Sequence, residues 1–326
     1  MTDATLAIAI PTYQRPDVLR RCLAEVLDDA EALGVAIYIS DDSSDADTEA
    51  MVADLSQRYP NIHYRHNRPA LRHDGNVLQT LLWPEADYVW LLGDARWVKR
   101  GQLARIKRFL TGQDMVFVNS HCSDTRTVKA AEGDDALHLA RDRLWHQTMT
   151  GATIYHRNVI RWAANDIIVK RNFPQISVIL GYLSSNPAKI GWFGEPSIGT
   201  VDKPSYWQSA MLDVFVDDWV SVVSAFPKVV SPSEMPSVVK AHSANMNLFS
   251  RKTLFELKAS KRVSWRALRR SHFLDAMHLN KWVVIGILIS PIFVVQVAKS
   301  VRALSRSRIA IRPPRPAPSS SPVAGW

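Results

Sequence analysis

Polar residues suited to nucleotide binding follow three apolar runs in the first hundred residues. Each run has the length and composition of a strand, and a polar segment comes directly after it. Carboxylates in such places can accept hydrogen bonds from a base N–H or from ribose hydroxyls, and the ring of Tyr13 can lie against a nucleobase. One Asp after a strand is common in surface loops, so the prediction of a shared site depends on all three. The polar segments are Pro11–Arg15, Asp41–Ser44 and Gly93–Asp94.

The elements that carry these segments alternate between strands and helices over roughly the first 120 residues. This alternation predicts an α/β fold with βαβ units around a parallel sheet, which binds ligands at the carboxyl ends of its strands. A helix is expected from Pro16, whose missing N–H costs nothing there, to Gly34. The predicted strands are Leu6–Ile10, Val35–Ser40, Ile62–Arg65, Asp87–Leu92 and Met115–Val118; the other predicted helices are Asp47–Tyr59 and 76–83; the clearest later elements are Gly151–His156, Phe173–Leu183 and Asp213–Ala225.

Three stretches of sequence resemble the N-terminal half of family 2 glycosyltransferases. They read IAIPTYQRPDVLRRCL, IYISDDSSDADT and YVWLLGD, and they are similar in character to abequosyltransferase-like members that build bacterial surface polysaccharides. The resemblance covers residues 5–120 well and continues faintly through Gly151–Thr153. It implies the GT-A fold, a Rossmann-like mixed and mainly parallel sheet flanked by helices. It also implies a nucleotide-sugar donor as the ligand of the strand-end site.

The resemblance assigns roles to individual residues at the strand ends. The aromatic and basic residues after the first strand would line the nucleotide pocket, and one of the two consecutive aspartates would hold the base or ribose. In the segment Arg72–Asn76, Asp74 and Asn76 could contact the nucleotide or donor sugar. Alternatively, Asp74 only lies near the N-terminus of a helix, where a carboxylate is favourable. The other residues implied for the nucleotide are Pro11, Tyr13, Arg15, Asp41, Asp42 and Ser43.

The expected metal motif departs from the family pattern. Relatives have two or three carboxylates after YVWLLGD that bind Mg²⁺ or Mn²⁺ at the donor diphosphate, whereas this chain continues as Gly93-Asp94-Ala95-Arg96. A single carboxylate is a poor site for a hard cation. Either Asp94 binds Mg²⁺ or Mn²⁺ with water and diphosphate completing its shell, or Arg96 replaces the ion and neutralises the leaving diphosphate directly.

An inverting transfer also needs a general base for the acceptor hydroxyl. Many relatives have a Glu-Asp pair after the segment that matches Gly151, but this chain has Phe173–Gln175 in about that place. Core packing is the better expectation for most tryptophans of this half, although stacking on a sugar is an alternative. His242 is expected in a loop, as an ordinary residue or as a further metal ligand. The remaining candidate bases are Asp166, Glu195 and Asp202, and the tryptophans are Trp145, Trp162, Trp192, Trp207 and Trp219.

The C-terminal region predicts attachment to a membrane. The net charge of the chain is +9, yet residues 258–315 hold thirteen Lys and Arg against the single acid Asp275. Trp282–Ala298 is uncharged but shorter than the roughly 20 residues of a bilayer span, and both of its flanks are basic. We therefore expect a peripheral or monotopic helix on the cytoplasmic face of the inner membrane, with a true span or a buried core helix as alternatives. Leu254–Leu279 is expected to lie on the surface as an amphipathic helix.

Together these features predict a glycosyltransferase with a lipid-linked or polysaccharide acceptor. No nucleic-acid motif is present, and an apolar run lies inside the basic region. Two cysteines and the short apolar N-terminus favour a reducing cytoplasm without a signal peptide. The alternatives are a catalytically degenerate, membrane-associated subunit and a nucleotidyltransferase, but PTYQRP lacks the glycines of a phosphate loop. The expected domains are residues 1–125 for the nucleotide sugar, 126–250 for the acceptor side, 251–312 for membrane attachment and a disordered tail, 313–326.

Overall fold

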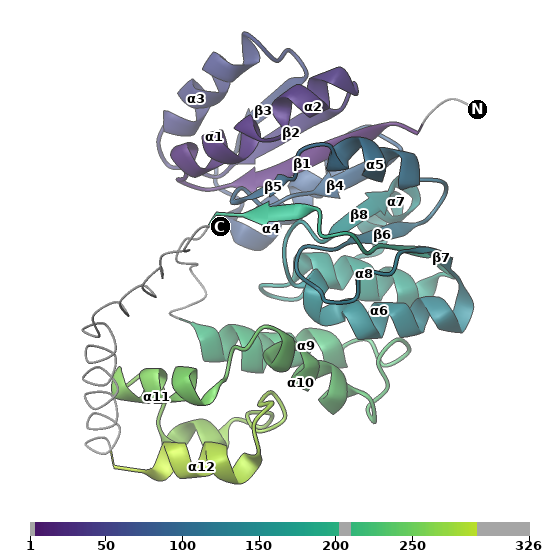
Figure 1. The fold of residues 1–326 in the computed structure, drawn as a ribbon. Helices are drawn as coiled ribbons and strands as arrows, with labels where there is room; N and C mark the ends of the chain where they lie inside the picture. Colours follow the sequence, from purple (N-terminus) through teal and green to yellow (C-terminus); the bar gives the residue numbers. More distant parts are fainter. Residues whose placement is uncertain (1–3, 202–209, 292–326) are drawn as a thin grey trace, which may run out of the picture. The chain divides into compact units, whose positions relative to one another are not determined.

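The first unit of the chain, Met1–Asn247, is organised around an eight-stranded sheet in the order β3-β2-β1-β4-β8-β6-β9-β7 (Figure 1). The computed structural model describes residues 4–201 and 210–291. A separate two-stranded sheet pairs β5 with β10 in antiparallel orientation. The strands are β1 Leu6–Thr12, β2 Ala36–Asp41, β3 Ile62–His66, β4 Tyr88–Leu91, β5 Arg96–Val98, β6 Met115–Val118, β7 Val128–Ala131, β8 Thr153–His156, β9 Ile190–Phe193 and β10 Ile198–Thr200.

Strand direction brings distant segments to one edge of the large sheet. β1 is parallel to both β2 and β4, while β8 is antiparallel to both β4 and β6. β6 therefore runs in the same direction as β4, and β9 is parallel to β6. As a result, the carboxyl ends of β1, β2, β4 and β6 all lie at the same edge, where open α/β sheets bind ligands.

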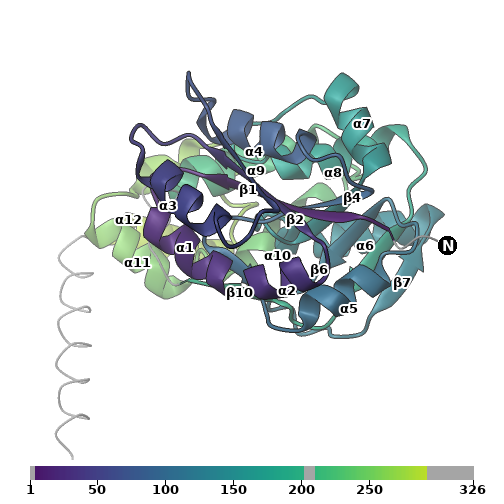
Figure 2. The same cartoon turned by 90° about the horizontal axis from the view of Figure 1, so that it is seen from above.

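Helices cover both faces of the sheet (Figure 2). α1, α2, α3 and α5 lie on one face, while α4, α6, α7 and α8 lie on the other and contact one another in neighbouring pairs. α9 and α10 pack together, and α10 also contacts α6. The helices of this unit are α1 Pro16–Ala24, α2 Leu27–Ala32, α3 Asp47–Ser56, α4 Arg72–Leu82, α5 Gln102–Phe109, α6 Gly133–Gln147, α7 Arg157–Asp166, α8 Pro174–Ser185, the π-helix η2 Asp213–Asp218, α9 Trp219–Ser224 and α10 Met235–Asn245.

The central strands are apolar along their whole length because the sheet is covered on both faces. Every residue of β4 and of β6 is buried, as are the first five residues of β1. The predicted bounds of β6 are confirmed. The single helix expected from Pro16 to Gly34 is instead two, α1 and α2, because the chain leaves helical geometry at Val26. α4 begins at Arg72, four residues before the predicted start, so Asp74 lies in its first turn.

The second unit, Leu248–Trp326, contains α11 Arg251–Ala259, the 3₁₀-helix η3 Trp265–Arg269 and α12 Lys281–Ile289. The expectation of one amphipathic helix over Leu254–Leu279 is wrong. Lys261 adopts a left-handed φ of 58° just after α11, and the Ser264 side chain caps η3 as a separate element.

The expected membrane segment is described only in part, since α12 covers its first half and residues 292–298 lie outside the described range, as does the tail 313–326. Within residues 4–201 and 210–291, no helix is long and apolar enough to cross a bilayer. The unit boundary at Asn247 lies three residues before the predicted one, and both predicted halves of the first 250 residues contribute strands to the same sheet.

Candidate active site

The ends of β1 and β2 are joined by a buried amide. Nδ2 of Asn76, in α4, donates to the carbonyl of Thr12 at 3.2 Å and to that of Ser40 at 3.1 Å. Its Oδ1 accepts from Nδ2 of Asn67 at 3.1 Å, and Asn67 also donates to Asp42. Asn76, one of the predicted nucleotide contacts, thus has donors and acceptors of the protein on both ends of its amide, and it fixes the spacing of the two strand ends.

The two consecutive aspartates differ in how many of their oxygens the protein uses. Asp41 is fully buried; its Oδ1 accepts from the backbone N–H and hydroxyl of Ser43, and its Oδ2 accepts from Tyr64 at 2.8 Å. Asp42 accepts through Oδ1 alone, from Asn67 at 2.8 Å and from the backbone N–H of Leu71 at 3.1 Å. Oδ2 of Asp42 takes part in none of the hydrogen bonds among the described residues. Asp42 is therefore the aspartate with an acceptor left for a ligand.

The loop after β1 is held against the loop after β2 in a strained conformation. Gln14 has a φ of 50°, a left-handed value that is uncommon outside glycine. Its backbone N–H donates to Ser43 Oγ at 2.7 Å, and its side chain donates to Ser44 Oγ at 2.6 Å. Pro11 lies within β1 opposite Ser40. The loop leaves the Tyr13 ring 57% exposed, so that it can contact a ligand.

Asp94 lies after β4 and is bonded to the loop after β1. Its Oδ1 is 3.3 Å from Nη1 of Arg15, and its Oδ2 accepts from Thr12 Oγ1 at 3.2 Å. Burial lowers the pKa of Arg96, which the negative charge of Asp94 partly offsets. Burial, and next the charge of Asp94, raise the pKa of Cys22 in α1 to about 11, so this thiol is protonated at neutral pH. We call the segments after β1, β2 and β4 the carboxylate side of the edge.

A pair of histidines lies at the same edge after β6. Ser120 Oγ is 2.5 Å from Nδ1 of His121 and 3.1 Å from Nε2 of His146, which comes from the end of α6. The imidazole of His121 is exposed, whereas that of His146 is buried. Sequence reasoning missed both, although Asn119-Ser120-His121 follows an apolar strand just as the other polar segments do. We call Ser120, His121 and His146 the histidine side.

Comparison with known proteins finds a family model that matches part of the first unit. Residues 7–158 match the family model described as Glycosyl transferase family 2. These residues form a family 2 glycosyltransferase domain. The match runs from β1 to just beyond β8, so it contains the carboxylate side and the whole histidine side. The resemblance given by the strand-end sequences is thereby confirmed.

A curated relative and several solved structures are similar to this chain. Abequosyltransferase RfbV of Salmonella typhimurium strain LT2 is 25% identical over 197 residues, which cover 56% of this chain and 57% of that protein. The alignment thus spans little more than half the length of the relative. The structure of S. aureus TarS 1-349 in complex with UDP-GlcNAc has a TM-score of 0.58 at 13% identity, and the match covers 94% of this chain and 87% of that one.

A further structure has a similar fold and contains a metal ion. Mannosyltransferase PcManGT from Pyrobaculum calidifontis, in complex with GDP-Man and Mn²⁺, has a TM-score of 0.54 at 12% identity and covers 93% of this chain and 88% of its own. At these identities the likeness establishes the fold, and the large, mostly parallel sheet flanked by helices is the GT-A fold that the sequence predicts.

The residues around Asp94 fit a resident divalent cation poorly. No group of three or more His, Cys, Asp or Glu that could hold a metal occurs in residues 4–201 and 210–291. Asp94 is a single carboxylate whose oxygens already bind Arg15 and Thr12, and the Arg96 cation lies close enough to interact with its charge. Hard cations bound to nucleotides use one or two carboxylates plus phosphate oxygens, and nearby guanidinium groups oppose a second positive charge.

The two described base candidates, Asp166 and Glu195, have different surroundings. Asp166 is exposed at the last residue of α7. Glu195 is held by Arg105, at 2.6 Å and 2.5 Å, and by the Gln102 amide at 2.7 Å. Asp202 lies outside the described residues. Asp74 accepts from the backbone N–H of Asn172 at 3.0 Å and bonds to its neighbour His73, so it ties the start of α4 to the segment before α8.

His242 does not lie in a loop as predicted but in α10, where it is buried between Phe215 and Trp219. Its Nε2 is 3.1 Å from Thr148 Oγ1, and burial lowers its pKa to about 3. The expectation of core packing is confirmed for Trp145, Trp192 and Trp219, which are buried, while Trp162 packs against Tyr182 and Trp207 lies outside the described residues.

Proposed function

We propose that the protein transfers a sugar, with inversion, from a nucleoside-diphosphate donor to a lipid-linked or polysaccharide acceptor in bacterial surface glycan synthesis. The single observation that carries the proposal is the carboxylate side, a set of polar strand ends within a family 2 glycosyltransferase domain. The names of the relatives agree with it, since one is an abequosyltransferase and others bind UDP-GlcNAc or GDP-Man.

In this proposal the nucleotide contacts are Asp42, Tyr13 and Arg15. Asp42 offers its unused Oδ2 to a base N–H or a ribose hydroxyl, and the exposed Tyr13 ring lies against the base. The neighbouring polar residues position them: Asn76 sets the distance between strand ends, and Asp41 with Ser43 fixes the loop after β2. Pro11, in β1, supports the loop that carries Tyr13, and Asp74 supports the start of α4.

The leaving diphosphate is met by arginine side chains. Bond cleavage between the anomeric carbon and the diphosphate oxygen leaves the electron pair on the diphosphate, and its growing charge must be stabilised. Arg15, which bonds to Asp94, and Arg96, whose charge interacts with that of Asp94, supply two guanidinium groups for this purpose. Such groups bind phosphate oxygens through charge-assisted hydrogen bonds. Asp94 then acts as the residue that positions Arg15. This assignment is the second of the two alternatives given by the sequence, in which Arg96 replaces the metal ion.

A screen of nucleotide sugars tests the function. Thermal shifts of the full chain are measured with UDP-, GDP-, CDP- and dTDP-sugars, each with and without Mn²⁺, and donors that stabilise the protein are then assayed for hydrolysis and transfer. One donor class should raise the melting temperature and release its nucleoside diphosphate slowly in water. If no nucleotide sugar binds, the proposal is wrong. Binding without any hydrolysis or transfer favours the alternative of a catalytically degenerate subunit. The observation that supports this alternative is that Asp94 is a single carboxylate where relatives have two or three.

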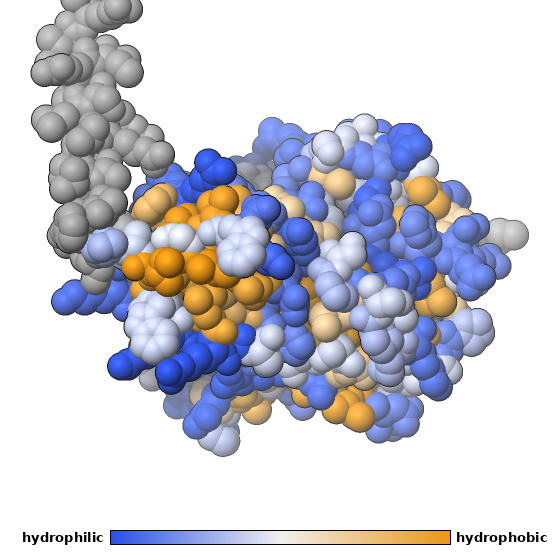
Figure 3. All heavy atoms as spheres, turned by 90° about the horizontal axis from the view of Figure 1, so that it is seen from below, coloured by the Kyte–Doolittle hydropathy of each residue, from blue (hydrophilic) through white to orange (hydrophobic). Residues whose placement is uncertain are grey.

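We further propose that the second unit attaches the enzyme to the cytoplasmic face of the inner membrane. Figure 3 shows hydrophobic side chains gathered beside hydrophilic ones on the face where Figure 1 draws α12. The exposed apolar side chains of this unit include Trp265 and Trp282, which are 49% and 69% exposed, together with Leu274 and Ile289. We call these four residues the apolar patch.

The charge around the apolar patch selects an anionic bilayer as its partner. Residues 248–291 contain nine Lys and Arg against two acidic residues. The guanidinium of Arg269 lies 4.9 Å from the Trp265 ring, and the ammonium of Lys281 lies 5.5 Å from the Trp282 ring. Tryptophan beside a cation suits the membrane interface, where the ring enters the headgroup layer and each cation contributes about 1 kcal/mol against anionic lipid.

Vesicle sedimentation tests the attachment. Full-length protein should pellet with vesicles of phosphatidylglycerol and phosphatidylcholine, less so in high salt, and not with phosphatidylcholine alone. Replacing both Trp265 and Trp282 with Ala should release most of it. The matched control is Ile168→Ala, since Ile168 is 68% exposed in the first unit. Undiminished pelleting of the double variant would overturn the role of the apolar patch.

A further inference from the structure

The histidine side lies at the same edge of the large sheet as the carboxylate side. β6 runs parallel to β4, so Ser120 and His121 come after β6 at the same edge as Asp94 after β4. Only β8 lies between these two strands. The charge of Arg96 affects both sides, since it acts on Cys22 beside Asp94 and on His121 and His146.

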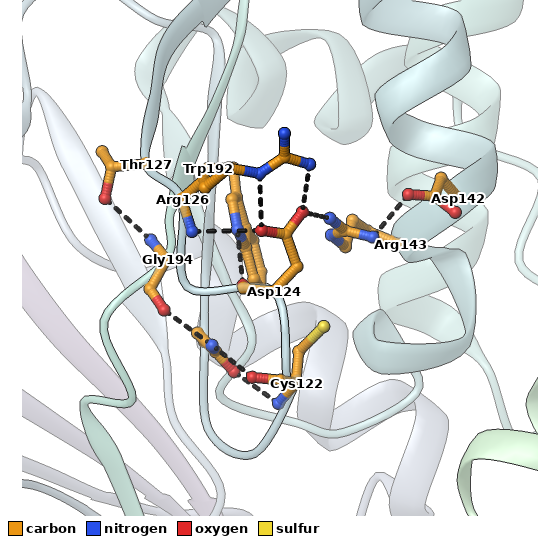
Figure 4. A network of polar contacts seen from close by, with 9 residues as sticks. Cys122, Asp124, Arg126, Thr127, Asp142, Arg143, Trp192 and Gly194 are labelled. Carbon is orange, nitrogen blue, oxygen red and sulfur yellow. Dashed lines mark hydrogen bonds and ion pairs between the residues drawn. The ribbon is translucent and has the colours of Figure 1, made fainter.

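The loop that carries His121 is fixed by polar contacts of residues that precede and follow His121 in the sequence. Asn119 donates to the carbonyl of Cys122 at 2.9 Å and to that of Gly194 at 2.7 Å, and it accepts from the Cys122 N–H at 2.7 Å. Asp124 accepts from Arg126 and from Nη2 of Arg143 in α6 (Figure 4).

Two further bonds join the same loop to β9 and to the residue that follows it (Figure 4). Nε1 of Trp192 donates to the carbonyl of Asp124 at 3.3 Å, and the N–H of Gly194 donates to Thr127 Oγ1 at 3.2 Å. A reactive group needs such a support, because its geometry must be set before the substrate arrives. An exposed histidine on a mobile loop would lack it.

The hydrogen bonds around Ser120 orient the ring of His121. The backbone N–H of Ser120 donates to Nε2 of His146 at 3.2 Å, so this nitrogen carries a lone pair. Burial, and next the nearby charges of His121, Arg143 and Arg96, lower the pKa of His146 to about 3, so it stays neutral. The Ser120 hydroxyl can therefore donate to His146 and accept from Nδ1–H of His121. Nε2 of His121, which takes part in none of the hydrogen bonds among residues 4–201 and 210–291, then carries the lone pair.

We propose that His121 is the general base of the transfer, and that Ser120 and His146 are the residues that position it. The proposal rests on the glycosyltransferase function proposed above. Nε2 of His121 takes the proton of the acceptor hydroxyl as the acceptor oxygen bonds to the anomeric carbon. The bond from that carbon to the diphosphate breaks, and its electron pair leaves with the diphosphate. The imidazolium retains its Nδ1–H bond to Ser120 and later loses the Nε2 proton to water.

The electrostatics keep the base in its active form at neutral pH. Partial removal from water lowers the pKa of His121 below its ordinary value of 6.5, and the Arg96 cation lowers it further. His121 is therefore neutral at pH 7 and able to accept a proton. The charged or titratable groups that act on the pair are Arg96 after β4 and Arg143 and His146 in α6.

The carboxylate candidates are less suited to the role. Glu195 is bound on both oxygens by Arg105, and Asp166 is exposed at the end of α7. Gln175, in the segment where relatives have acidic residues, donates to the carbonyl of Thr148 at 2.9 Å and cannot serve as a base. Its Oε1 is buried without a partner among the described residues. If the general base lies elsewhere in the site, an amide such as that of Gln175 can occupy this position.

Kinetics of His121→Gln test the proposal with the donor and acceptor found by the screen. The variant should lose about 10²-fold or more in kcat, the usual contribution of a general base. Its affinity for UDP or GDP, whichever the native protein binds, and its melting temperature should stay unchanged. The acidic limb of the native pH profile should disappear. Ser120→Ala should reduce kcat less and shift that limb, while His138→Gln, an exposed histidine of α6, should behave as native.

Histidine NMR titration of the full chain gives a second test that needs no acceptor. His121 should titrate below 6.5 in the native protein and at a higher pH in Arg96→Ala. A His121 that titrates at 6.5 or above overturns the proposal, and so does native kcat in His121→Gln. If the native protein binds nucleotide but never transfers a sugar, the proposed function fails, and the base assignment fails with it. Full transfer activity in His121→Gln would overturn the base assignment alone and leave the proposed function intact.

Discussion

The carboxylate side and the histidine side share one sheet edge, but they use their polar groups differently. On the carboxylate side, Asp41 and Asn76 are bonded to the protein at both ends and serve to shape the pocket. On the histidine side, His146 is buried and neutral while the imidazole of His121 is exposed. A conspicuous acidic motif can thus be largely structural, whereas a single histidine beside it keeps its reactive atom for substrate. The charge of Arg96 acts on groups of both sides, so replacing Arg96 is the first test of this comparison.

Arg96→Ala should have the largest effect of any single change on activity. If this guanidinium meets the leaving diphosphate, its loss should lower kcat by about 10²–10³-fold, as for removal of one donor to a developing anion. Arg96→Lys should recover part of the rate, and EDTA should leave native transfer largely intact. Abolition of native activity by EDTA would contradict the arginine account and return Asp94 to the role of metal ligand. In that case Arg96→Asp should raise metal affinity instead of destroying activity.

The buried imidazole of the histidine side should make folding sensitive to acid. His146 has a pKa of about 3 when folded and 6.5 as its ordinary value, so the unfolded chain binds a proton that the folded one does not. Its contribution is complete above pH 6.5 and is lost as the pH falls from 6.5 towards 3. The slope is about 1.4 kcal/mol per pH unit, or roughly 3 kcal/mol by about pH 4.5.

Urea unfolding at several pH values measures this effect. The difference in unfolding free energy between pH 7 and pH 5 should be smaller in His146→Gln than in the native protein, whatever the stability of the variant at pH 7. His138→Gln, an exposed change on the same helix, should retain the native slope. Equal slopes in all three proteins would show that His146 is accessible to protons in the folded state.

The sequence contained more information about the carboxylate side than about the histidine side. Strand ends are recognisable because β1, β4 and β6 are continuous apolar runs, and β6 has the predicted bounds. The assignment of Asp41 and Asp42 as alternatives could not be refined, because their difference depends on Tyr64 and Asn67, which β3 and the segment after it bring close. Likewise, the contact between Asp94 and Arg15 joins residues 79 positions apart.

The histidine side was missed for a different reason. The family resemblance implies a carboxylate base after the segment that matches Gly151, and it does not point to Ser120 or His121. Its pairing with His146 requires the end of α6 to return to the end of β6, which periodicity does not specify. In the second unit, the amphipathic pattern was read as one helix, but the left-handed residue Lys261 ends α11 and no property of lysine predicts that conformation.

Asp42→Asn and Asp41→Ala should separate the ligand contact from the structural residue on the carboxylate side. Asn at position 42 keeps an acceptor for Asn67 and Leu71 but replaces the unused oxygen with a donor. Affinity for the nucleoside diphosphate should fall by about 1–2 kcal/mol with little change in melting temperature. Asp41→Ala leaves Tyr64 and Ser43 without their acceptor, so it should lower the melting temperature as well. Calorimetry in which Asp42→Asn binds as native would remove Asp42 from the nucleotide site.

The smallest expected effect, at Tyr13, tests whether the carboxylate side recognises the base by shape or by specific bonds. The ring is 57% exposed, and the loop that carries it is already fixed by the bonds of Gln14 to Ser43 and Ser44. A ring held in this way loses little freedom when a base stacks on it. Tyr13→Ala should therefore weaken binding of the preferred nucleoside diphosphate by about 1 kcal/mol, the lower range for loss of a stacking platform.

Tyr13→Phe keeps the face of the ring and removes the hydroxyl, so its affinity distinguishes the two forms of recognition. Native affinity means that stacking is sufficient, and the penalty of Tyr13→Ala should then be nearly the same for UDP, GDP and CDP, because every base has a π-face. Selection among bases would in that case depend on Asp42, whose free oxygen distinguishes a base N–H from an acceptor. If Tyr13→Phe binds as weakly as Tyr13→Ala, the phenol itself makes a hydrogen bond to the ligand. In that case Tyr13 would recognise the ligand through a specific polar bond and not through the shape of its ring. The carboxylate side and the histidine side would then not differ in this respect.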